Sequence, residues 1–229
     1  MISFKGRHFP KDIILMAVRL KIAYGLSYRD IEEIMAERGK IVDHSTIQKW
    51  VFKYSPELEQ ALRSRKKPVG SSWRMDETYQ KIKGQWHYLY RAVDTSGQTV
   101  DFFLSKNRDR FSALSFFRKA IGSSGIPHKV NIDKSGANTA ALKRINLLLW
   151  ISGLWPYMIH VRRVKYLNNL IEQDHRRIKR VTKPPLGFKS FASAEATTSG
   201  IEMYHMLRKK QMIDPHNKPA WKQFYELAA

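Results

Sequence analysis

Residues 73–104, WRMDETYQKIKGQWHYLYRAVDTSGQTVDFFL, carry the clearest signal of the fold class. Aromatic and β-branched residues are frequent in it, and turn signals at Gly84-Gln85 and at residues 94–97 interrupt it. Successive strands joined by such short turns form an antiparallel meander. We therefore expect three strands, at residues 73–83, 86–93 and 98–104.

Helix-like and strand-like segments alternate after this meander. We expect helices at residues 110–121, 137–149 and about 168–180, and strands at residues 129–133 and 155–161. The first of these helices is expected to bury Phe111, Leu114, Phe117, Ala120 and Ile121. Three antiparallel strands followed by alternating helices and strands predict an α/β layer fold with a mixed sheet, which is the order of the ribonuclease-H-like fold.

The segment before the meander reads as three helices. The first spans residues 12–24, the second follows Ser27 with Asp30 as a weak capping box, and the third follows Asp43 or Ser45. Pro56 either closes the third helix or begins another turn. This outline is that of a helix-turn-helix unit. The later helix of the pair, here the third helix of the chain, enters the major groove of DNA. An ordinary three-helix bundle with a polar face is the alternative.

The third helix carries polar side chains on its outward face. They are donors suited to base edges and to phosphates, and they are the predicted DNA-binding residues of this unit. They are His44, Thr46, Gln48, Lys49 and Lys53.

Residues 64–72 form the best linker candidate because they combine a basic run with Pro68, Gly70 and two serines. After Pro184-Pro185 the chain reads as helical from about residue 192 to 212, and it ends in an aromatic tail. The predicted domains are an all-α helix-turn-helix domain (1–66), a ribonuclease-H-like α/β catalytic core (67–200) and a C-terminal helical tail (201–229).

The composition indicates a polyanionic partner. The chain of 229 residues holds 41 Lys+Arg against 20 Asp+Glu, a net charge of +21. Nucleic acid is the first candidate and an anionic membrane surface the second. A basic protein of ribosomal type is the remaining interpretation. The absence of cysteine excludes disulfides, thiolate zinc sites and a cysteine nucleophile, and it fits a reducing compartment.

The longest apolar stretch runs from Leu147 to Ile159 and is interrupted by Ser152, Gly153 and Pro156. It is shorter than the roughly 20 residues that a membrane span needs, so we interpret it as core. The N-terminus shows no apolar segment of a secretory signal. A soluble cytoplasmic protein is the expectation.

Three acidic residues stand in contexts that suit a metal-bound carboxylate. Asp76 lies in the first strand, Asp133 closes the fourth, and Glu172 lies in the helix that follows. Because the fourth strand pairs beside the first in this fold, the two aspartates are expected to converge. Hard divalent cations prefer oxygen ligands, and two ions about 4 Å apart can clamp the attacking and leaving oxygens of a phosphoryl transfer.

Other acids compete for this role, since any three can be chosen from 20. Glu77 is expected to point to the opposite face of its strand from Asp76. Asp94 sits in a turn signal, and Asp174 is expected to face away from Glu172. The remaining competitor is Asp101.

Two cations follow Glu172 on the same helix. Lys179 lies seven positions later, two turns on the same face, where a cation can contact the DNA backbone beside a metal site. Arg176 lies four positions later and can pair with Glu172 or contact phosphate. A solvated face is the alternative interpretation of residues 176–180.

The motif VKYLNNLIEQDHR, residues 164–176, resembles the glutamate motif of bacterial DDE transposases, and within them the insertion-sequence-six family. The first-acid motif of that family is similar to residues 73–79, and the second to residues 133–138. Residues 186–191, LGFKSF, also match. The resemblance extends from the helix-turn-helix segment to about Lys210.

This resemblance implies an enzyme in which Asp76, Asp133 and Glu172 hold Mg²⁺, or Mn²⁺ as a substitute, with Lys179 as the basic residue after the glutamate. It implies binding to double-stranded DNA, namely the terminal inverted repeats of a mobile element and a target. Strand cleavage would free a 3′ hydroxyl that attacks the target without a covalent protein–DNA intermediate, in replicative, cointegrate-type transposition. A homodimer or larger assembly, in the bacterial cytoplasm at the nucleoid, is implied as well.

One feature departs from the family. The 38 residues between Asp133 and Glu172 exceed the usual spacing, and part of the surplus is the apolar stretch 147–156. Loop lengthening costs little, so an active enzyme is compatible with the longer spacing, as is a drifted copy. Three rivals remain: a DNA-binding regulator without catalysis, a nuclease that does not join strands, and a structural protein that bridges DNA ends.

Overall fold

The computed structural model describes residues 2–6, 8–133, 135–182, 187–213 and 217–228. Pro184, Pro185 and Leu186, which the sequence analysis used, lie outside these ranges. The chain forms two compact units, Met1–Lys67 with Ile178–Ala229, and Pro68–Arg177. Residues 178–200, assigned from the sequence to the catalytic core, thus belong to the first unit. None of the described helices is long and apolar enough to cross a membrane.

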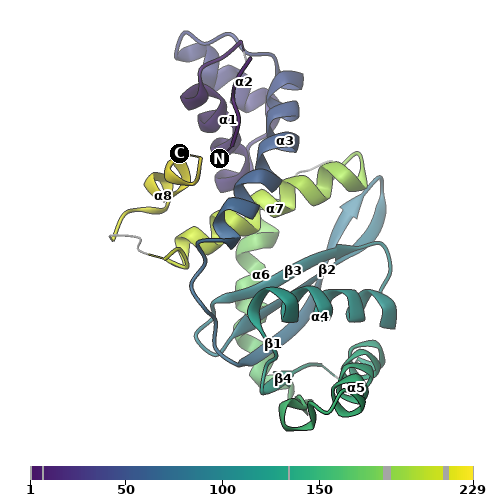
Figure 1. The fold of residues 1–229 in the computed structure, drawn as a ribbon. Helices are drawn as coiled ribbons and strands as arrows, with labels where there is room; N and C mark the ends of the chain where they lie inside the picture. Colours follow the sequence, from purple (N-terminus) through teal and green to yellow (C-terminus); the bar gives the residue numbers. More distant parts are fainter. Residues whose placement is uncertain (1, 7, 134, 183–186, 214–216, 229) are drawn as a thin grey trace. The chain divides into compact units, whose positions relative to one another are not determined.

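The first unit begins with the three expected helices (Figure 1). Ser27 and Asp30 form a capping box at the start of the second, as the sequence indicated. Gly25 ends the first with φ +71°, and a Cβ there would lie 2.9 Å from the carbonyl oxygen of Val181. The helices are α1 (Lys11–Tyr24), α2 (Tyr28–Glu37) and α3 (His44–Arg63).

Helix α3 continues through Pro56 to Arg63, which settles the alternative that the sequence left open. One side of α3 is apolar and buried, with Trp50 only 6% exposed. Helix α7 (Phe191–Arg208) packs closely on it, since a Cβ on Gly200 would lie 2.7 Å from Ser55 Oγ. The C-terminal tail adds α8 (Ala220–Leu227).

The second unit is built on a five-stranded sheet in the order β3-β2-β1-β4-β5. The first three strands are antiparallel neighbours, whereas β4 and β5 run parallel to β1. This order and these directions are those of the ribonuclease-H-like fold, so the predicted fold class is confirmed. The strands are β1 (Ser72–Ile82), β2 (Gln85–Asp94), β3 (Thr99–Ser105), β4 (Lys129–Asn131) and β5 (His160–Arg162).

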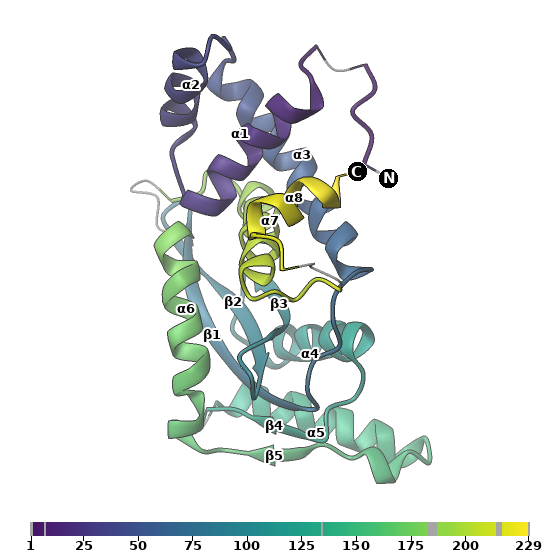
Figure 2. The same ribbon diagram turned by 90° about the vertical axis from the view of Figure 1, so that its left-hand side faces the viewer.

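Different helices lie on the two faces of the sheet. Helices α4 (Arg110–Ser124) and α5 (Gly136–Ile151) enclose the apolar core with Met75 and Ala92. Side chains alternate along a strand, so the neighbouring pair Asp76 and Arg91 faces the other way. Helix α6 (Asn169–Thr182) runs beside β1 there (Figure 2), after the short 3₁₀ turn η2 (Lys165–Asn168).

Two local predictions were wrong. The expected strand 155–161 is the 3₁₀ turn η1 (Trp155–Tyr157) followed by the short β5, because Pro156 lacks an N–H and has a fixed φ. Phe111 is 64% exposed, since α4 buries Ala113 and Phe116 instead. A one-residue shift in helical phase accounts for this difference.

Candidate active site

The sheet brings Asp76 and Asp133 together with Glu77. Each offers a carboxylate oxygen, and these oxygens lie within 4.8 Å of one another. Strand β4 pairs with β1 up to Arg74 and Asn131, so the chain leaves β4 for Asp133 beside the middle of β1. Asp133 Oδ1 then accepts a hydrogen bond from the Ser135 N–H (2.9 Å), which fixes the carboxylate at the start of α5. The expected convergence of the two aspartates is therefore present.

Sequence reasoning missed Glu77 as a member of this cluster. Glu77 leaves β1 on the α4–α5 side, as strand alternation predicted, but Asp133 lies past the end of β4 and is within reach from both sides. Asn138 Nδ2 donates to Glu77 Oε1 at 3.0 Å. The useful signal was the pair of adjacent acids opposite the end of a short neighbouring strand.

Arg108 is a cation already present in the cluster. Its Nη2 atom lies 3.4 Å from Glu77 Oε2 and 3.4 Å from Asp133 Oδ2. Burial raises the pKa of the Glu77 carboxyl above its ordinary value, and the charge of Arg108 opposes that shift. Arg108 therefore offsets part of the repulsion among three close carboxylates.

Glu77→Gln is expected to raise the melting temperature at pH 7 without added metal, because it removes a buried carboxylate. The raised folded-state pKa means that protonated Glu77 favours folding below the unfolded pKa, and that this gain is lost as the pH rises through the folded pKa. The advantage of the variant should thus shrink towards pH 4 in thermal melts. A constant difference between pH 4 and pH 7 would contradict the assignment.

A buried network docks α6 on the sheet. Arg91, fully buried on β2, donates to Asp174 Oδ2 (2.7 Å) and to His175 Nδ1 (3.0 Å). A guanidinium cannot accept a hydrogen bond, so Nδ1 is the acceptor and the ring proton is on Nε2. His175 Nε2 lies 3.3 Å from Asp76 Oδ2. The network therefore ties α6 to the first acid of the cluster.

A second contact fixes the start of α6. The Asn131 side chain donates to the Val164 carbonyl (3.0 Å) and to Asn168 Oδ1 (2.6 Å), and it accepts from the Val164 N–H (3.2 Å). One carboxamide on β4 thus holds the segment that leads into the helix.

Glu172 lies between these two anchors. Asn168 ends the turn η2 just before α6, and Glu172 lies in the first turn of α6, three residues before His175. Its side chain is exposed. The described residues contain two groups whose possible ligand atoms lie within 4.8 Å of one another: Asp76 with Glu77 and Asp133, and Glu32 with Asp43 and His44. Glu172 is in neither group. The site thus joins two of the three predicted acids and adds one that was not predicted.

The donors present suit a hard divalent cation. All are carboxylate oxygens, the ligands that Mg²⁺ and Mn²⁺ prefer, and no softer donor is needed. Close carboxylates that are part-shielded from water repel one another, and a bound cation relieves that repulsion.

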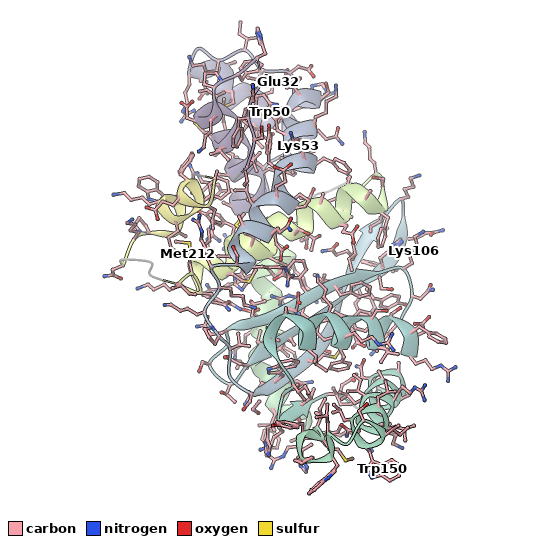
Figure 3. All side chains as sticks on the ribbon, in the orientation of Figure 1. Glu32, Trp50, Lys53, Lys106, Trp150 and Met212 are labelled. Carbon is pink, nitrogen blue, oxygen red and sulfur yellow. The ribbon has the colours of Figure 1, made fainter. Side chains whose placement is uncertain are left out.

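The predicted DNA-binding residues differ in exposure. Gln48 and Lys49 are exposed on α3, whereas His44, Thr46 and Lys53 are half-buried. His44 Nδ1 lies 3.1 Å from Glu32 Oε2, and Lys53 Nζ lies 5.0 Å from the centre of the Tyr54 ring. Figure 3 labels Glu32 on α2 and Lys53 on α3. Arg176 and Lys179 are exposed on α6.

A cavity of about 440 Å³ adjoins the start of α3 within the same unit. His44 and Gln48 line it together with Tyr28, Phe188 and Lys189. The LGFKSF stretch therefore contributes side chains to the surface around the predicted DNA-binding helix.

A ribonuclease-H-like sheet with clustered carboxylates where its first and fourth strands meet defines a class of metal-assisted phosphoryl-transfer enzymes. A DDE domain family, that of the IS240-type transposases, matches residues 70–211. The transposase for insertion sequence-like element IS431mec of Staphylococcus aureus strain N315 is 44% identical over 208 residues, 90% of this chain and 89% of that protein. The chain belongs to the insertion-sequence-six family of DDE transposases.

Two further similarities accompany this match. The transposase for insertion sequence element IS257 in transposon Tn4003, also of Staphylococcus aureus, is 44% identical over the same share of the chain. The HTLV-2 integrase catalytic core domain in complex with magnesium aligns with a TM-score of 0.46 at 20% identity, covering 68% of this chain and 97% of that chain. The match to the DDE domain and to these transposases makes the protein a polynucleotidyl-transferase of the DDE type.

Proposed function

We propose that this transposase cuts the ends of its own insertion sequence and joins them to target DNA in a magnesium-dependent reaction. Asp76, Asp133 and Glu172 are the metal ligands and catalytic residues in this proposal. Its main support is the meeting of Asp76 and Asp133 beside the anchored helix that carries Glu172. Mn²⁺ is the expected substitute, because it accepts the same oxygen donors.

Each residue of the site has a role in this reaction. A divalent ion held by Asp76, Asp133 and Glu172 would neutralise charge at the scissile phosphate and would make the attacking oxygen more nucleophilic. His175 and Arg91 orient Asp76, and Arg108 balances the acids before metal binds. Lys179 contacts the DNA backbone, as does Arg176. Water attack frees a 3′ hydroxyl, which then attacks the target strand directly.

Recognition of the terminal inverted repeats is assigned to a helix-turn-helix domain at residues 1–66, followed by the catalytic core from residue 67. Gln48 and Lys49 are exposed where the recognition helix of such a unit meets the major groove. His44, Thr46 and Lys53 complete the proposed surface. The cointegrate-type, replicative mode and the location at the nucleoid in the cytoplasm are part of the same proposal.

Lys49→Ala is expected to weaken binding to the terminal repeats and to reduce the salt slope of binding by about one. Without this phosphate contact, binding releases about one counterion fewer. Lys49→Arg keeps the charge and is the matched control, with an unchanged slope. Fluorescence anisotropy at several salt concentrations measures both quantities, and an unchanged slope in the alanine variant would remove Lys49 from the interface.

The function itself is tested with labelled linear DNA that carries the ends of the element. Wild-type protein is expected to give cleaved and joined products with Mg²⁺, none with EDTA, and products again when Mn²⁺ replaces Mg²⁺. Pre-cut ends separate joining from cleavage, so a nuclease that does not join strands is recognised by hydrolysis alone. Specific binding without any cut strand would instead indicate a regulator.

A further inference from the structure

The apolar stretch that the sequence placed in the core lies on the surface. Eight large apolar side chains between Leu147 and Met158 are 36–66% exposed, and Trp150, Trp155 and Tyr157 are all at 60% or more. We call residues 147–158 the apolar knob. It comprises the last turn of α5, the turn at Gly153 and η1, and Figure 3 shows Trp150 beside α5 on the side away from the sheet.

The knob is held in a defined shape at its base. The Asn146 side chain donates to the Ile159 carbonyl (2.9 Å) and accepts from the Ile159 N–H (2.8 Å), so it closes the segment like a clasp. Gly153 has φ +72° and donates to the Trp150 carbonyl (3.1 Å), which ends α5. Leu149 packs against the core from below. The exposed side chains are therefore presented on a preorganised support, which lowers the cost of binding.

The exposed area is large for a protein that acts alone. These side chains together expose roughly 800 Å², counting about 150–250 Å² for each aromatic residue in full. The largest apolar patch of a typical monomer is about 300–600 Å². One partner in a stable protein–protein interface contributes about 800 Å². The area thus matches one side of such an interface.

Charge decides between the kinds of partner. Residues 145–159 contain no charged side chain, although 27% of the whole chain is charged and the net charge is +21. A surface for the DNA backbone needs cations, which this segment lacks. Two copies of so basic a chain repel one another, and the repulsion is smallest where the meeting faces carry no charge. Aromatic residues and methionine are also the types enriched at the centre of protein interfaces.

We propose that the apolar knob is a self-association surface through which two copies of this chain meet, knob against knob. A twofold axis brings the same patch of both copies together, so the apolar faces cover each other and the cations remain outside. Trp150 and Trp155 are the central contacts. This dimer forms without DNA and does not depend on the metal site.

The test is sedimentation equilibrium of the full chain without DNA. The double variant Trp150→Glu/Trp155→Glu is expected to weaken dimerisation at least about 100-fold, because two central aromatic anchors are replaced by charges. Trp86→Glu is the matched control, since Trp86 is 60% exposed on the β1–β2 hairpin. All three proteins should melt at similar temperatures, which excludes unfolding as the cause.

Cross-linking gives an independent measurement, because the chain has no cysteine. Trp150→Cys as the single thiol should be cross-linked to a second copy by a short bis-maleimide, whereas Trp86→Cys should not. A monomeric wild-type protein at micromolar concentrations would overturn the proposal. So would a dimer that the double variant leaves intact, or a monomer whose knob binds a single-stranded oligonucleotide or an anionic vesicle. Since none of these measurements involves cleavage, failure here is distinct from failure of the proposed reaction.

Discussion

Asp133→Asn is expected to lower strand cleavage and joining on the order of 10³-fold or more while leaving affinity for the terminal repeats unchanged. The substitution keeps the shape of the side chain and the acceptor for the Ser135 N–H, but it removes the negative charge. Loss of a charged metal ligand removes transition-state stabilisation that no other group in the cluster replaces. Both reactions are measured on labelled linear ends in Mg²⁺, and binding is measured in parallel.

The matched control is Asp109→Asn. Asp109 lies in the loop beside Arg108, outside the cluster, and caps α4 by accepting from the Ser112 N–H at 2.8 Å. Asparagine caps a helix about as well, so this variant should stay close to wild type. Glu172→Gln is expected to behave like Asp133→Asn. If Asp133→Asn also lost its binding to the ends, the assignment of Asp133 to the chemistry would be wrong.

Arg91→Ala is expected to cost about 3–5 kcal/mol in unfolding free energy, the cost of removing one partner from a buried ion pair. The guanidinium is fully buried, and without it the Asp174 carboxylate, only 10% exposed, loses its 2.7 Å partner. For a chain of 229 residues the melting temperature should fall by about 2–4 °C for each kcal/mol. Calorimetry measures the change.

Two further variants isolate the cause. Asp174→Asn in the Arg91→Ala background removes the orphaned charge and should recover part of the loss. Arg118→Ala removes an exposed arginine of α4 and should change stability by no more than about 0.5 kcal/mol. A loss of equal size in Arg118→Ala would point to net charge rather than to the buried network. Equal stability of Arg91→Ala with and without Asp174→Asn would show that the unpaired Asp174 carboxylate does not cause the loss.

The sequence predicted those parts of the fold that depend on local pattern. In the meander 73–104, residue types and turn signals predicted the strands. Ser27 and Asp30 predicted the start of a helix. The convergence of Asp76 and Asp133 followed from strand order alone. These features are fixed by neighbours along the chain or by a fold with few variants.

The features that the sequence did not predict depend on the boundaries of elements and on which side chains face solvent. Glu77 joins the cluster because β4 stops at Asn131, a boundary that alternation along β1 does not reveal. Residues 147–158 looked like core because hydrophobicity does not distinguish an interior from an exposed interface. Phe111 was placed inside because a short amphipathic pattern fits two helical phases.

The carboxamide of Asn131 bears on how this chain tolerates its longer spacing between Asp133 and Glu172. Its hydrogen bonds to Val164 and Asn168 fix the position of the start of α6 relative to β4. This position therefore does not depend on the length of the chain between the two elements. The two hydrogen bonds between the Asn146 side chain and the Ile159 backbone hold the two ends of the intervening apolar knob together. The apolar knob can therefore become longer or shorter while the start of α6 keeps its position. Its sequence can vary independently of the site that holds the acidic residues.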